Sequence, residues 1–155
     1  MMNFKKINTL FRVALSLVAL LGLGFLLLLA PKMAHYFSIQ KYNLFLQLFF
    51  WITALPVYYI LFSLWRISTD LKHEKLFTPH TQKRLKTIAY AGIGESVFYA
   101  LLLICGLIFL KANMPFYLLS GLFFLIGIII AIIATLLFHL FTVAEQLKQD
   151  SDLTI

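Results

Sequence analysis

The sequence predicts an all-α integral membrane protein: a four-transmembrane-helix bundle with both termini in the cytoplasm and a helical cytoplasmic hairpin between the second and third helices. Three observations support this fold class. The 155 residues are 62% hydrophobic and only 12% charged, which is about half the charged share of an ordinary soluble domain. Four long apolar runs follow one another along the chain. Lysine and arginine are distributed unequally between the two sides that these runs would create.

The four apolar runs define the expected spans of a single membrane domain covering residues 1–155. A helix rises about 1.5 Å per residue, so roughly 20 residues cross about 30 Å of hydrocarbon. None of the runs shows the two-residue alternation of barrel strands, and helices then satisfy the backbone in lipid. The predicted spans are residues 13–30, 44–65, 88–110 and 116–141, with a cytoplasmic loop at 66–87 and a cytoplasmic tail at 142–155.

The first run also has features of a signal peptide, because it begins beside Lys5, Lys6 and Arg12 and has an apolar centre. Its apolar stretch is long for a signal core, and Ala30 is followed directly by Pro31 without a small-x-small cleavage pattern. We therefore expect an uncleaved membrane helix.

Pro56 lies in the middle of the second run. A proline removes one helical hydrogen bond and frees the carbonyl four residues earlier, here that of Ile52. Thr53 is close enough in sequence to satisfy part of the freed backbone, so we expect a kinked helix. The kink serves either as a hinge or only to shape the bundle.

The basic residues predict the orientation. Ten of the 13 Lys and Arg residues lie in the N-terminal segment, the loop 66–87 and the tail, and three lie on the other side. The positive-inside rule places the richer side in the cytoplasm. We therefore expect a multi-pass protein of the bacterial cytoplasmic (inner) membrane. The net charge of +7 then reflects topology and attraction to anionic lipids, not direct binding of nucleic acid.

The loop 66–87 is the main soluble element, and we expect it to form a compact helical hairpin. Thr78 suits a helix N-cap and Pro79 suits the first helical position. The loop is basic and the tail is acidic, so the two segments could attract each other. In one interpretation both are solvated flanks, and in the other the loop docks a cytoplasmic partner. The candidate docking residues are Arg66, Lys72, Lys75, Phe77, Thr78, Lys83, Arg84 and Lys86.

The same loop carries a resemblance to a known family. Its Leu-Trp-Arg-Ile at 64–67, Leu-Lys at 71–72, Phe-Thr at 77–78 and Lys-Arg-Leu-Lys-Thr-Ile at 83–88 resemble a bacterial family of four-span membrane proteins catalogued as a domain of unknown function (DUF2975-like). Members often have an asparagine three residues after the threonine, where this chain has Thr81. Many members are encoded beside a small Cro/C1-type helix-turn-helix regulator, so the resemblance implies a regulatory role.

Two ionisable groups lie inside the predicted spans: Glu95 in the third, and His139 near the cytoplasmic end of the fourth. Such groups are candidate functional groups. Each lies beside a row of small residues at four-residue spacing, which lets helices approach closely in lipid. The rows are Gly92, Ser96 and Ala100, and Gly127, Ala131 and Thr135.

Folding the last two spans about a turn at 111–115 predicts their register. It places Ala100 level with Gly127, and Ser96 level with Ala131. Glu95 and His139 are then about two helical turns apart, roughly 12 Å along the axis, with side chains leaning toward each other. One interpretation is a direct or water-bridged pair. The other is a protonated Glu95, or one bonded to Thr135 or Tyr99, with His139 at the membrane interface.

No catalytic, cofactor or metal-binding motif is recognisable in the sequence. His73, Glu74 and His80 share the loop without a further ligand at metal spacing. We therefore expect neither enzymatic activity nor a cofactor. The expected function is regulatory, with the loop holding a small helix-turn-helix regulator at the lipid bilayer; homo-oligomerisation is left open. The alternative is a small transport or immunity protein that acts within the bilayer through Glu95 and His139.

Overall fold

The computed structural model describes residues 3–72 and 78–153, and these residues form helices joined by short turns. The first membrane segment consists of α1 (Phe4–Gly24), η1 (Phe25–Leu29) and α2 (Ala30–Tyr36), which follow one another without a break. A short 3-10 turn, η2 (Gln40–Tyr42), leads into α3 (Asn43–Lys72). The second half contains α4 (Pro79–Cys105), η3 (Gly106–Leu110) and α5 (Met114–Leu153).

Four helical segments are long and apolar enough to cross a membrane: Lys5–Tyr36, Gln40–Asp70, Pro79–Leu110 and Met114–Leu153. They confirm the predicted all-α fold class with four helices. Each segment is longer than the apolar run that predicted it, because an established helix adds one hydrogen bond per residue and continues beyond the hydrocarbon. The loop 66–87 is therefore largely helical, since α3 runs to Lys72 and α4 starts at Pro79.

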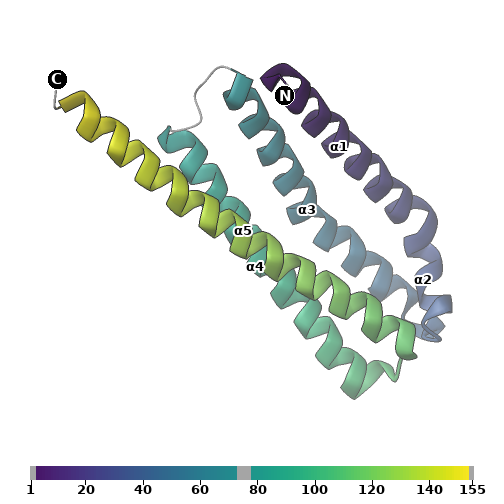
Figure 1. Ribbon diagram of the computed structural model, residues 1–155. Coiled ribbons are helices and arrows are strands. Elements are labelled where there is room, and N and C mark those ends of the chain that lie inside the picture. Colours follow the sequence, from purple (N-terminus) through teal and green to yellow (C-terminus); the bar gives the residue numbers. More distant parts are fainter. Residues whose placement is uncertain (1–2, 73–77, 154–155) are drawn as a thin grey trace.

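The helices are arranged with both chain termini at the same end of the bundle (Figure 1). The end of α3 and the start of α4 lie at that end too, which we call the terminal end. The opposite end, which we call the turn end, holds α2, η2 and the reversal into α5. The α5 helix packs most extensively on α4, and α3 packs on both α1 and α4. The bundle thus consists of two helical pairs joined through α3 and α4.

The first segment contains a π-helical turn just before Pro31. A proline has no amide donor, and its ring clashes with the carbonyl four residues earlier. The wider π geometry of η1 accommodates this, and the Ala30 amide donates to the Phe25 carbonyl. The segment therefore remains helical through the proline.

A second π-helical turn, η3, precedes the reversal between α4 and α5. The Gly106 carbonyl accepts hydrogen bonds from the Lys111 amide at 3.1 Å and from the Tyr117 hydroxyl at 2.9 Å. Lys111 then adopts a left-handed conformation with a φ of 46°, a common way to end a helix. Asn113 connects this reversal to the first half of the chain, because its side-chain amide donates to the Tyr36 carbonyl at 2.8 Å.

The main core lies toward the turn end and is rich in aromatic side chains. Phe37 and Phe116 meet edge to face with ring centroids 5.4 Å apart, and Phe25 meets Phe50 in the same way at 5.3 Å. Such pairs stabilise packing beyond the area that they bury. Many leucines on the outer faces are highly exposed, including Leu21 at 74% and Leu107 at 71%. In a membrane protein these faces contact lipid.

Candidate functional site

At the terminal end, α1 and α3 are joined by a buried polar network. The Arg12 guanidinium donates to the Ser68 hydroxyl at 3.2 Å and to the Thr69 hydroxyl at 2.9 Å. Ser68 in turn donates to the Asn8 side-chain carbonyl. The Arg12 guanidinium also lies over the Trp65 ring, 5.1 Å from its centroid. Because Asn8 and Ser68 are only 8% and 1% exposed, these bonds satisfy groups that would be costly to bury unpaired.

The two arms of the hairpin are joined by an ion pair between Asp70 and Arg84. The Thr81 hydroxyl donates to the same Asp70 oxygen at 3.4 Å, and its oxygen lies 3.3 Å from the Thr78 hydroxyl. The helix α4 begins at Pro79 with Thr78 at the N-cap position, as the sequence predicts. Thr81 is fully buried, so it has a structural role in the hairpin.

Among the described residues, one contact between the tail and the hairpin uses the neutral side chain of Gln82. The Gln82 side-chain amide donates to the Glu145 carboxylate. The Thr142 hydroxyl donates to the Gln82 side-chain oxygen Oε1 at 3.4 Å. The expected proximity of loop and tail is present, but these bonds use an amide on α4 rather than a lysine or arginine. Charge patterning could not indicate these bonds, because Gln82 carries no charge.

These three groups of contacts lie at the same end of the bundle, and together we call them the terminal polar layer. It connects α1 to α3, α3 to α4, and α4 to α5. Its members are Asn8, Arg12, Ser68, Thr69, Asp70, Thr78, Thr81, Gln82, Arg84, Thr142 and Glu145. Sequence reasoning missed most of them, although the consecutive polar residues at 68–70 after an apolar run were an available indication.

The structure divides the candidate docking residues into three groups. Arg66, Lys83 and Lys86 are exposed, and the Arg66 guanidinium lies 5.0 Å from the centroid of the Phe62 ring. Arg84 and Thr78 are engaged within the terminal polar layer. The side chains of Lys72, Lys75 and Phe77 lie outside the part of the structure that is described. The accessible docking candidates among the described residues are therefore Arg66, Lys83 and Lys86.

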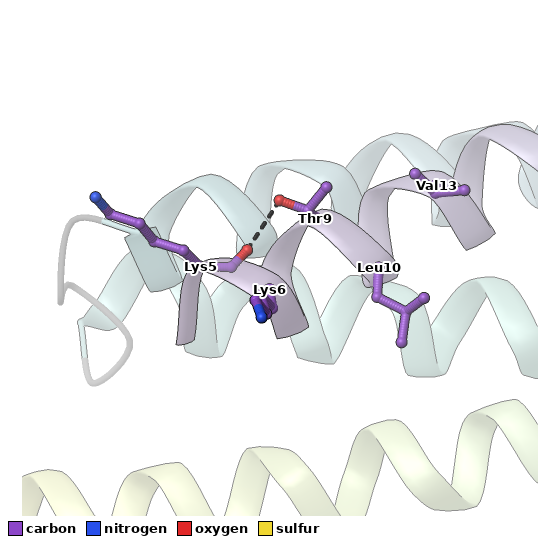
Figure 2. Close-up of a pocket in the computed structure, with 5 residues that line it drawn as sticks. All are labelled: Lys5, Lys6, Thr9, Leu10 and Val13. Atoms are coloured by element: carbon purple, nitrogen blue, oxygen red, sulfur yellow. Dashed lines mark hydrogen bonds between the residues drawn. The ribbon is translucent and has the colours of Figure 1, made fainter. Parts of the chain in front are cut away.

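A shallow groove runs along α1 at the same end (Figure 2). It is lined by Lys5, Lys6, Thr9, Leu10 and Val13. The Thr9 hydroxyl donates to the Lys5 carbonyl at 2.8 Å and is therefore engaged within its own helix. Amines beside apolar side chains suit the boundary between lipid head groups and acyl chains. Across residues 3–72 and 78–153, no group of three or more His, Cys, Asp or Glu could hold a metal ion.

Within the membrane, α4 and α5 approach closely at their small residues. A Cβ atom added to Gly92 would lie 2.8 Å from the Gly127 carbonyl oxygen and 3.1 Å from the Ala131 amide nitrogen. The Ser96 hydroxyl lies 3.0 Å from the Phe124 carbonyl across the interface and 3.1 Å from the Gly92 carbonyl on its own helix. The predicted small-residue interface is therefore present.

The predicted register of this interface is wrong by about one helical turn. Gly127 lies against Gly92 and Ser96 rather than Ala100, and Ala131 lies against Gly92 rather than Ser96. Two features of the reversal explain the shift. The chain turns at 111–113 and α5 already starts at Met114, earlier than a turn spanning 111–115. The π-helical η3 also uses more residues per turn than an α-helix.

The corrected register separates Glu95 from His139. Glu95 is nearly level with Gly127, so His139 is about 18 Å further along α5, at about 1.5 Å per residue. Glu95 is buried and His139 is exposed, and no described residue bonds to the Glu95 Oε1 atom. Thr135 donates to the Ala131 carbonyl of its own helix at 2.7 Å. The predicted approach of Glu95 and His139 is therefore wrong.

Pro56 lies within α3, which continues as a helix from Asn43 to Lys72. We expected the Thr53 side chain to satisfy part of the backbone that Pro56 frees, but its hydroxyl does not bond to the freed Ile52 carbonyl. Its hydroxyl instead donates to the Phe50 carbonyl at 3.2 Å and lies 3.3 Å from the Tyr99 hydroxyl. The threonine thus connects α3 to α4 at the level of the proline.

Comparisons with known proteins agree with this architecture. Residues 27–155 match the model of a family described as "Protein of unknown function (DUF2975)", and the chain belongs to that family. It is 28% identical to the "Uncharacterized membrane protein YoaS" of Bacillus subtilis (strain 168), over 97% of this chain and 99% of that protein. No solved structure matches the chain. The protein is thus a multi-pass membrane protein, as the four spans indicate.

Proposed function

We propose that this member of the DUF2975 family docks a cytoplasmic protein, a small helix-turn-helix regulator, at the bacterial cytoplasmic membrane. In this proposal the terminal end faces the cytoplasm. The support for that orientation is the excess of Lys and Arg in the segments that the fold brings to the terminal end. The docking surface is the basic face of the hairpin around Arg66, Lys83 and Lys86.

The observation that carries the proposal is that neighbouring basic residues on α4 lie in different environments. Arg84 is half-buried and paired with Asp70, whereas Lys83 and Lys86 are exposed. One residue therefore holds the hairpin together, and its neighbours remain accessible to a partner.

The terminal polar layer supports the same function by fixing the surface in place. Buried and half-buried hydrogen bonds join the four long helices at this end, so the exposed lysines project from a preorganised support. Preorganisation reduces the entropy cost of binding. A basic surface selects a partner with an acidic face. A helix-turn-helix regulator could present such a face on the side opposite its basic DNA-binding surface, and binding would then hold it at the membrane.

Co-purification after mild detergent extraction tests this proposal. The regulator should be recovered with the wild-type protein and lost with a Lys83→Glu, Lys86→Glu double variant. The matched control is Lys32→Glu, Lys41→Glu, which reverses two exposed lysines outside the hairpin. If no regulator is recovered and deletion leaves target-gene expression unchanged, the docking function is wrong.

The alternative of transport or immunity within the bilayer used Glu95 and His139 together. Because the helix register places these two groups far apart, the geometry supports docking better.

A further inference from the structure

Glu95 is a buried carboxyl group in the middle of a membrane span. It lies near the centre of the segment Pro79–Leu110 and is only 6% exposed. Its Oε1 atom is buried and receives no hydrogen bond from any residue that the structure describes. A buried carboxylate without a partner is strongly disfavoured, in lipid above all. Some positively charged species must therefore neutralise it.

The neighbouring hydroxyl groups cannot supply that positive charge. Tyr99 follows Glu95 by one helical turn, so both side chains lie on the same face of α4. Thr53 donates to the Phe50 carbonyl at 3.2 Å, and its oxygen lies 3.3 Å from the Tyr99 hydroxyl, where either group can be the donor. Both hydroxyls are uncharged, and the Tyr99 oxygen has acceptor capacity.

No other charged side chain faces this site from the packed helices. Residues 43–65 of α3 and 114–138 of α5 contain no Asp, Glu, His, Lys or Arg. Their tyrosines near the core are engaged elsewhere, because Tyr58 donates to the Ala19 carbonyl at 2.8 Å and Tyr117 donates to the Gly106 carbonyl. The neutralising species must therefore come from outside the chain.

We propose that Glu95 and the Tyr99 hydroxyl oxygen form an intramembrane binding site for a small monovalent cation, either a proton or a sodium ion. Oxygen donors suit hard cations. A single carboxylate balances one positive charge, whereas a divalent ion would leave an excess charge in the bilayer. This site is separate from the docking surface at the terminal end and does not depend on it.

Thermal stability of the full-length protein in detergent tests the proposal. The folded protein holds a cation at Glu95 that the unfolded chain releases, so stability should fall as pH rises and the proton is lost. Glu95→Gln is neutral at every pH and should lose this component of the pH dependence. Asp152→Asn removes an exposed carboxylate of the tail and is the matched control that should keep it. If Glu95→Gln and wild type share the same pH dependence, the proposal is overturned.

Added sodium distinguishes the two cations. At alkaline pH, replacing choline by sodium at constant ionic strength should restore the stability of wild type, but not of Glu95→Gln, if the site binds sodium. If sodium does not restore the stability of wild type at alkaline pH, and wild-type stability still falls as pH rises, the proton is the ligand.

A second measurement keeps the proposal testable if Glu95→Gln does not fold. An apolar carbodiimide reacts with protonated carboxyl groups inside membranes, and peptide mass spectrometry locates the adduct. Wild-type Glu95 should be labelled at acidic pH, and labelling should fall at alkaline pH or on adding sodium. Labelling that ignores both pH and sodium, or no labelling of Glu95 at any pH, would overturn the proposal.

Discussion

Replacing Gly127 by alanine places a methyl group into the closest contact between α4 and α5. The new Cβ atom would lie 2.8 Å from the Gly92 carbonyl oxygen and 3.1 Å from the Ser96 amide nitrogen. Both are backbone atoms, so neither can move aside as a flexible side chain would. Overpacking of this kind typically costs about 1–3 kcal/mol. Removing a glycine from a helix offsets up to about 1 kcal/mol of that cost.

The same helix provides a matched control at Gly121. A Cβ atom added there meets nothing within 4 Å, so Gly121→Ala gains helix propensity without a clash. We expect Gly127→Ala to be less stable than Gly121→Ala by about 1–3 kcal/mol, or somewhat less, because separated helices remain well solvated by acyl chains. Thermal aggregation of the purified protein in detergent measures the difference.

Cysteine cross-linking tests the register independently. In a Cys105→Ala background, a cysteine pair at Ser96 and Gly127 should cross-link more efficiently than a pair at Ala100 and Gly127. If Gly127→Ala behaves like Gly121→Ala, or if the 100–127 pair cross-links better, the close approach described above is not the one that the protein uses.

Two further predictions concern the terminal end. Arg84→Ala should destabilise the protein by about 1 kcal/mol, the upper range for a half-exposed ion pair, and a double-mutant cycle with Asp70→Asn should show coupling between the two residues; additive effects would contradict the pairing. For the orientation, a single cysteine at Lys41 should react with an impermeant thiol reagent added outside intact cells, and one at Asp150 should not; the reverse pattern would invert the proposed topology.

Hydropathy predicted the four helices because the backbone in lipid has few alternatives to helix. It did not predict how far they extend. The ends of α3 and α5 lie beyond the apolar runs, where hydropathy no longer indicates structure. Outside the apolar runs, side-chain chemistry indicated one helix boundary. Thr78 and Pro79 mark the start of α4, as expected.

The small residues of α4 and α5 were sufficient to predict that these helices pack together, but not their register. Register depends on the number of residues consumed in the reversal, and that number depends on the π-helical η3 and on the left-handed Lys111. A lysine in that conformation has no clear sequence signature, since glycine usually fills the role. The error then propagated to Glu95 and His139, whose expected proximity relied on the same register.

The contact between α4 and α5 joins segments that are adjacent in the chain, and this influences the order of assembly. Helices in lipid form first and associate afterwards, and contacts between sequence neighbours carry a small loop-closure cost. The α4–α5 hairpin can therefore pack as soon as both helices have inserted. Arg12 is in the opposite situation, because Ser68 and Thr69 emerge more than 50 residues after it. The first helix to enter the membrane must wait for the end of the second span before its N-terminal polar groups are paired.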